Sequence, residues 1–346
     1  MTRAYNTATT QQNTGGAVAG VTAGKNGVIN GGFDIWQRGT SVAVASTVFG
    51  YTADRWLTNQ QSAITVSRQS VSDTTNLPNI LYCARYQRNS GQTSTTVVQL
   101  TQPFENINST PFVGKTVTLS FYARKGADFS SSGSILNAVL YTGTGFDQNL
   151  LSSYTGAATP LVSANTLTTT WQRFTVTGTV SASATEVAPY FYYTPTGTAG
   201  TNDYYEITGV QLELGSVATP FSRNAASIQG ELAACQRYFQ KSFQYSTAPA
   251  NNASDVAGAI SFARQATSGS VEPQVLIVWK VQMRIAPSVT LYNLYSGTAG
   301  QWSDGTTTGA NARCFNISDS AAPIDNTDVT LAVANASIHY AASAEL

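Results

Sequence analysis

Few residues of this chain could carry out acid–base chemistry. His339 is the only histidine, and the 18 acidic residues are spread over 346 positions. Catalytic triads and metal sites built on histidine are therefore close to excluded. Glycoside hydrolysis needs two carboxyl groups about 5 to 10 Å apart in a cleft. The closest C-terminal pair, Asp325 and Asp328, lies in a segment typical of a solvated turn. We predict that the chain is not an enzyme.

The cysteines and acidic residues indicate no metal centre. Cys83, Cys235 and Cys314 are far apart and lack a Cys-X-X-Cys spacing, so we predict three reduced thiols rather than a disulfide or a zinc site. Asp34 and Glu206 could supply oxygen to calcium. Calcium takes six to eight oxygen ligands, however, and the sequence does not supply the set. We therefore predict no metal and no cofactor.

The side chains best suited to binding alternate with apolar residues along the chain. They are one arginine and four tyrosines: Tyr122, Arg124, Tyr141, Tyr190 and Tyr192. A tyrosine ring offers apolar area on which a sugar ring can stack, while its hydroxyl stays hydrated. If their strands are neighbours, these five side chains form a carbohydrate-binding platform, with Arg124 donating to sugar hydroxyls. The alternative is that a neighbouring subunit or the second domain covers this face, which explains outward tyrosines equally well.

The elements that position these side chains are predicted strands. From Val28 to about Phe221, apolar and polar residues alternate in short runs separated by clusters of Gly, Asn, Ser and Thr. This pattern is typical of an antiparallel sandwich or barrel. The clearest strands are predicted over 115–124, 135–142, 171–180 and 187–194.

A single helix is predicted to follow, over 227–240. Ile228, Leu232 and Cys235 recur at helical spacing, and Ser227 is available as the N-cap. Alternation then resumes, and it predicts the strands of a second, smaller β domain over 256–262, 275–283, 288–295, 313–317 and 329–340. The predicted domains are a polar arm (1–27), a first β domain (28–225), a helical linker (226–240) and a C-terminal β-sandwich (241–346).

The tryptophans are predicted to serve packing rather than sugar binding. Trp36 and Trp56 sit in motifs that favour core or edge packing, and Trp171, Trp279 and Trp302 are similar. Trp302 lies in segment 297–309, which is rich in Gly, Ser and Thr, and we predict that it is the most loop-like of the five tryptophans. This segment, like 143–149 and 194–202, is a candidate recognition tip.

Charge and hydropathy exclude two classes of partner. Only 10% of the residues are charged and the net charge is zero, so binding nucleic acid through its phosphates is not expected. No stretch approaches 18 consecutive apolar residues, which excludes insertion into a membrane by a helix. The polar N-terminus lacks the features of a signal peptide.

Several motifs together resemble a known class of protein. They are Asn30-Gly-Gly-Phe-Asp-Ile-Trp-Gln-Arg38, Tyr51-Thr-Ala-Asp-Arg-Trp56, Thr118-Leu-Ser-Phe-Tyr-Ala-Arg124, Trp171-Gln-Arg-Phe174, Ile207-Thr-Gly-Val-Gln-Leu-Glu-Leu-Gly215, Ala218-Thr-Pro-Phe-Ser-Arg223 and Glu231-Leu-Ala-Ala-Cys-Gln-Arg-Tyr-Phe-Gln240. They resemble the jelly-roll modules of bacteriophage tail-fibre and related virion proteins, which are similar to carbohydrate-binding modules. The close of the chain, from Val281, looks like the C-terminal β domain of such proteins.

The resemblance implies an all-β protein: a jelly-roll β-sandwich, a short helix and a second, smaller C-terminal β-sandwich. It implies a virion structural protein, most readily a tail fibre that recognises a host surface glycan. A homotrimer is expected, with the helix near its axis and the arm attaching to other virion proteins. The alternatives are a capsid or neck decoration protein without a host ligand, and a polysaccharide depolymerase.

Overall fold

A computed structural model describes residues 24–45, 48–60, 63–254, 256–263, 274–303, 311–326 and 335–346. The predicted N-terminal arm therefore lies outside the described residues except for its last four. Those four pack on the first domain, where Asn26 is fully buried and the Gly24 amide donates to the Asn224 carbonyl at 2.8 Å. Within the described part of the chain, no helix has the length and apolar character needed to cross a membrane.

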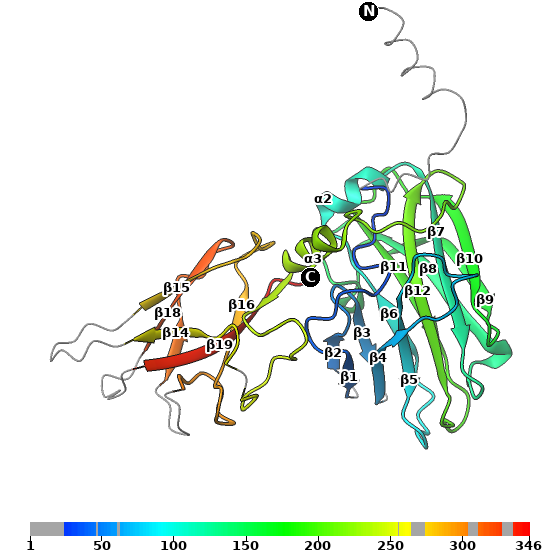
Figure 1. Ribbon diagram of the computed structural model, residues 1–346. Helices are drawn as coiled ribbons and strands as arrows, with labels where there is room; N and C mark the ends of the chain where they lie inside the picture. The colour runs from blue at the N-terminus through cyan, green and yellow to red at the C-terminus, as the bar shows by residue number, and fades with distance from the viewer. Residues whose placement is uncertain are drawn as a thin grey trace, which may run out of the picture.

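The first domain consists of two antiparallel sheets that, over the described residues, have six strands each (Figure 1). Sheet A contains, in spatial order, β1 (Ser41–Val44), β4 (Ile64–Ser70), β5 (Tyr82–Arg88), β12 (Tyr204–Leu214), β7 (Thr116–Lys125) and β10 (Gln172–Thr179). Sheet B contains β2 (Val48–Tyr51), β3 (Leu57–Gln60), β6 (Val98–Thr101), β11 (Glu186–Tyr193), β8 (Ile135–Gly143) and β9 (Ala158–Thr166).

The strand pairing is nested. β5 pairs with β12, β6 with β11, β7 with β10, and β8 with β9, each pair antiparallel. Successive strands thus alternate between the two sheets until the chain turns back at the β8–β9 connection. This arrangement is a jelly roll, and it confirms the predicted all-β sandwich.

The core lies between the sheets, where the predicted alternation places it. Val117, Leu119 and Phe121 of β7 are fully buried. Trp36 and Trp56 are also buried core residues, as predicted, and the Trp56 ring stacks on Phe33 with centroids 5.0 Å apart. Aromatic contacts of this kind add to the free energy gained from apolar burial.

The helices are short. α2 (Asn106–Ser109) is followed by the 3₁₀ turn η1 (Thr110–Phe112), and two more such turns are η2 (Ser132–Ser134) and η3 (Leu150–Ser152). α3 (Ile228–Gln236) begins at the predicted N-cap, because the Ser227 hydroxyl accepts from the Gly230 amide at 3.1 Å. It ends before the predicted residue 240, since Phe239–Lys241 pairs with β19 as strand β13.

The second domain contains β13 (Phe239–Lys241), β14 (Ile260–Ala263), β15 (Gln274–Val278), β16 (Ser288–Tyr292), β17 (Ala312–Cys314), β18 (Ala321–Asn326) and β19 (Asn335–Ser343). Strands β13, β14 and β16 pair with β19, and β18 lies between β15 and β17. Trp302 is fully buried in the core of this domain, and its indole NH donates to the Asp325 carbonyl at 3.3 Å. The buried Trp302 side chain agrees with the core packing predicted for the tryptophans, and the residue itself belongs to no strand. Part of the predicted strand 329–340 and of segment 297–309 lies outside the described residues.

The two domains are joined through α3 and through the last two residues of the sequence (Figure 1). The Glu345 carboxylate pairs with Arg55 and, at 3.0 Å, with Arg38. The Leu346 carbonyl accepts from the Tyr51 hydroxyl at 2.9 Å and from the Asn149 amide at 3.0 Å. These contacts hold the C-terminal domain against one end of the jelly roll.

Candidate functional site

The five predicted binding residues do not form one platform. Tyr141 lies on β8, and Tyr190 and Tyr192 lie on β11, all in sheet B. Tyr122 and Arg124 lie on β7 in sheet A. The outward faces of the two sheets of a sandwich point away from each other. The expectation that these strands are neighbours was therefore wrong for β7, because the chain crosses from sheet A to sheet B between β7 and β8.

The three tyrosines of sheet B lie together on its outer face. The Tyr190 ring is centred 5.3 Å from that of Tyr141 and 5.3 Å from that of Tyr192. All three side chains are partly exposed, whereas Phe191 between them points into the core. The Tyr190 hydroxyl donates to the side-chain oxygen of Gln99 on the adjacent strand β6. We call Gln99, Tyr141, Tyr190 and Tyr192 the tyrosine face.

A wall flanks the tyrosine face. Segment 144–157, which connects β8 to β9, places Leu150 and Tyr154 on Ala188, and Tyr141 and Tyr190 pack against this small cluster. This segment also contacts the second domain, because the Asp147 carboxylate pairs with Arg284 of that domain at 3.3 Å. Sequence reasoning missed this wall and also Gln99, although Gln99 alternates with the buried residues Val98 and Leu100 and could have been found from that pattern.

The surroundings of Tyr190 keep its phenol protonated. Burial raises the pKa of Tyr190, and the neighbouring Tyr141 and Tyr192 raise the pKa further. A protonated phenol donates one hydrogen bond and accepts others. The tyrosine face thus presents aromatic rings whose hydroxyl groups can form hydrogen bonds.

A buried carboxyl group lies beneath the wall. Glu186 is fully buried, and one of its oxygens accepts from the Gln148 backbone amide at 2.5 Å. Hydrogen bonds from the Gln148 and Gly145 backbone amides favour the Glu186 carboxylate. Within the described residues, the hydroxyl of the nearby Tyr154 has no hydrogen-bond partner. Burial raises the pKa of the Glu186 carboxyl. The neutral acid therefore persists to a higher pH in the folded state than in the unfolded chain, because burial disfavours the carboxylate.

This burial predicts a pH-dependent effect of Glu186→Gln. Because the folded pKa of Glu186 lies above its unfolded value, the wild type loses stability as the pH rises through the unfolded value of about 4.5. Glutamine cannot ionise. We expect Glu186→Gln to be more stable than the wild type at pH 7 and to lose this advantage at pH 4, as measured by urea denaturation.

Glu213→Gln is the control with the opposite sign. Burial opposes ionisation of Glu213, but hydrogen bonds from Thr219 and Gln211 outweigh it and lower the pKa of this carboxyl. Its contribution to stability is present at neutral pH and is lost on acidification. The same pH response in both variants would contradict the assignment of a raised pKa to Glu186.

Arg124 is engaged in an ion-pair network on the outer face of sheet A. Its Nε lies 2.5 Å from one oxygen of the buried Glu206, and Arg85 binds the other oxygen at 2.8 and 2.6 Å. Asp34 is bound by Arg223 at 2.8 and 3.2 Å. Both carboxylates considered for calcium are thus held by arginines. The described residues contain no cluster of three or more His, Cys, Asp or Glu that could hold a metal ion.

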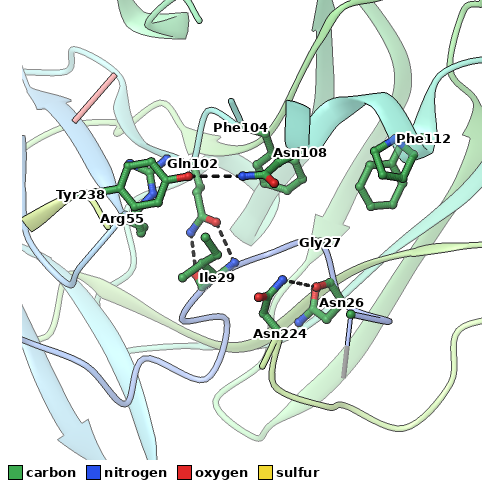
Figure 2. A pocket seen from close by; sticks show the side chains of 12 residues that line it. Asn26, Gly27, Ile29, Arg55, Gln102, Phe104, Asn108, Phe112, Asn224 and Tyr238 are labelled. Carbon is green, nitrogen blue, oxygen red and sulfur yellow. Dashed lines mark hydrogen bonds between the residues drawn. The ribbon is translucent and has the colours of Figure 1, made fainter. Parts of the chain in front are cut away.

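A cavity of about 220 Å³ lies between the start of the jelly roll, α2 and Tyr238 (Figure 2). The amide side chains that line it form hydrogen bonds with the backbone of the first residues of the jelly roll. Gln102 exchanges two hydrogen bonds with the backbone of Ile29, at 2.8 and 2.7 Å, and Asn224 donates to the Asn26 carbonyl at 2.6 Å. The cavity is also smaller than the roughly 300 to 1,000 Å³ typical of ligand pockets. We interpret this cavity as a gap between packed elements rather than as a ligand-binding site.

No protein-family profile and no curated protein sequence matches the chain. Its fold is similar to that of solved structures of low sequence identity. A carbohydrate-binding module titled "CBM4 structure and function" is 18% identical, with 44% of this chain and 87% of that chain covered and a TM-score of 0.28. TmCBM61, in complex with beta-1,4-galactotriose, is 12% identical, with 55% and 99% covered and a TM-score of 0.32. A Stig cyclase from Fischerella sp. TAU is 10% identical, with 57% and 100% covered and a TM-score of 0.35.

Proposed function

We propose that this protein binds glycans without catalysing a reaction, and that the tyrosine face is the binding surface. One observation carries the proposal: three partly exposed tyrosine rings lie side by side on an open sheet face, beside a wall held in place by a second domain. Sugar rings stack on such aromatic surfaces through their apolar faces. Tyrosine hydroxyls and the Gln99 amide supply hydrogen bonds to sugar hydroxyls.

The chemistry of the surrounding residues supports binding over catalysis. Glu186 is buried beneath the wall and bonded to backbone, so it does not reach a sugar stacked on the tyrosines. Weak stacking contacts of this kind bind usefully when several copies act together.

The biological setting proposed for this activity is a bacteriophage virion. The motifs that resemble tail-fibre modules support it, and the N-terminal arm would attach the protein to the particle as part of a homotrimer. In a trimer, three tyrosine faces would raise the avidity for a repetitive surface glycan. A decoration protein is the alternative if a neighbouring subunit covers the tyrosine face, and a depolymerase is the alternative if the glycan is cleaved.

Glycan binding is tested with Tyr192→Ala and the double variant Tyr190→Ala, Tyr192→Ala. Loss of one stacking ring is expected to raise the dissociation constant about fivefold, since aromatic contacts contribute about 1 kcal/mol each. Binding is measured on a panel of bacterial surface polysaccharides and then by titration calorimetry with the best ligand. Tyr122→Ala is the matched control, because it removes a tyrosine from sheet A and is expected to bind as the wild type does.

The outcomes separate the three readings. Unchanged glycan binding in a correctly folded double variant would contradict the tyrosine face as the binding site. A loss of affinity in Tyr122→Ala equal to that in the double variant would also contradict it, because Tyr122 lies on the other sheet. Shortening of the polysaccharide during incubation would favour the depolymerase. Light scattering that gives the mass of one chain would contradict the trimer.

A further inference from the structure

A second, larger groove lies where three of the sequence motifs meet. Its volume is about 620 Å³. Asp34 and Ile35 come from the first motif, Arg223 comes from the motif at 218–223, and Ile228 and Leu232 come from α3. The tyrosine face does not use these motifs. The groove therefore has no part in the glycan-binding proposal, and the inference drawn from it does not depend on that proposal.

The walls of the groove are apolar and open to solvent. Leu81 is 60% exposed, Ile228 is 45% exposed and Tyr245 is 42% exposed. The Tyr245 ring is fixed in place, because its hydroxyl accepts from the Trp36 backbone amide at 2.9 Å and donates to the Asp34 carbonyl at 3.2 Å. Exposed apolar side chains grouped around a groove mark a binding surface more often than scattered ones do.

The charges on the groove leave one cation uncompensated. The Asp34 carboxylate is bound by Arg223 through two contacts at 2.8 and 3.2 Å, so this pair is neutral. Arg68 lies over the Tyr82 ring, with its guanidinium carbon 4.4 Å from the ring centroid. In the described part of the chain, the Arg68 guanidinium takes part in no hydrogen bond or ion pair that would neutralise it. The groove therefore combines apolar walls with one available positive charge.

We propose that this groove binds a small amphipathic anion. The apolar group of this ligand lies against Leu81, Ile228 and Tyr245, and the acidic group of the ligand is bound by Arg68. The volume lies within the range of about 300 to 1,000 Å³ that holds small molecules. The apolar walls do not match a sugar, whose hydroxyl groups would lack partners there. A guanidinium binds carboxylate, sulfonate and phosphate through paired N–H groups, so the acidic group can be any of these.

The proposal is tested with two fluorescent probes of the same ring system. Anilinonaphthalene sulfonate carries an anion, and N-phenyl-1-naphthylamine carries none. We expect the wild type to bind the sulfonate about fivefold more tightly, because an exposed charge pair contributes up to about 1 kcal/mol. Arg68→Gln is expected to remove this preference and leave binding of the uncharged probe unchanged. Lys115→Gln, which removes a distant exposed charge, is expected to bind both probes as the wild type does.

The apolar walls are tested by the double variant Leu81→Ser, Ile228→Ser. Loss of apolar contact area is expected to weaken both probes about tenfold. The matched control is Leu276→Ser, Val278→Ser on β15, because these side chains are similarly exposed, at 61% and 66%. An equal effect of the two double variants, or a sulfonate preference that survives Arg68→Gln, would overturn the proposal. Circular dichroism confirms that each variant is folded.

Discussion

Replacing Arg88 by methionine is expected to lower the free energy of unfolding by about 3 to 5 kcal/mol, the cost of leaving a buried charge without its partner. Arg88 and Asp203 are both fully buried and lie 2.8 Å apart. Arg88 also donates to the Gln92 and Ser94 carbonyls, at 2.9 and 2.6 Å. Methionine fills a similar volume but supplies neither a charge nor a donor. Urea denaturation of the purified variant measures the loss.

Two controls isolate the charge at Asp203. Adding Asp203→Asn to Arg88→Met removes the uncompensated carboxylate, and the double variant is expected to recover part of the loss. Arg313→Met breaks a pair with Asp325 in which the Arg313 side chain is 60% exposed. Solvent screens a surface pair of this kind, so its contribution to stability is expected to be much smaller than that of the buried pair. Similar losses in Arg88→Met and Arg313→Met would contradict the buried-charge argument.

Replacing Glu345 by alanine is expected to cost about 3 kcal/mol and to uncouple the two domains. Arg55 is 1% exposed, and Glu345 is its carboxylate partner. Arg55 also donates to the Pro103 carbonyl at 2.7 Å and lies over the Tyr238 ring, whose centroid is 3.6 Å from the guanidinium carbon. Neither neutralises the cation. Calorimetry is expected to show one unfolding transition in the wild type and two in the variant.

Glu345→Gln distinguishes charge from contact at the same position. It keeps an oxygen that can accept from Arg55 but removes the negative charge, so its loss of stability is expected to fall between those of the wild type and Glu345→Ala. A single transition in Glu345→Ala, at the wild-type temperature, would show that the other contacts between the domains couple them without Glu345.

The strands of the jelly roll could be predicted because their signal is local. The predicted ranges 115–124 and 187–194 match β7 (Thr116–Lys125) and β11 (Glu186–Tyr193) to within one residue at each end. Alternation shows which side chains face the core, since successive residues of a strand point to opposite sides. It also identified Tyr190 and Tyr192 as outward residues.

The same signal could not show which sheet a strand joins. Arg124 and Tyr141 are both outward on consecutive strands, yet β7 belongs to sheet A and β8 to sheet B. The sheet that a strand joins depends on its pairing with strands that are distant in the sequence, such as β12 for β7 and β11 for β8. The residue pattern of the strand itself does not indicate this pairing. Long-range pairing also ended α3 early, because Phe239 pairs with Ser343. The Gly- and Ser-rich surroundings of Trp302 indicate a loop, and they do not show which residues of the second domain pack around its side chain.

The nested pairing of the jelly roll has a consequence for synthesis of the chain. Arg85 on β5 pairs with Glu206 on β12, which follows 121 residues later. At a ribosomal rate of about 5 to 20 residues per second, β5 waits roughly 6 to 24 s for its partner. The β8–β9 hairpin can form first because its pairing is local. The pairs β7–β10, β6–β11 and β5–β12 can then form in that order, as each later strand is synthesised. Such a high contact order predicts slow folding, in which β12 completes the sandwich last.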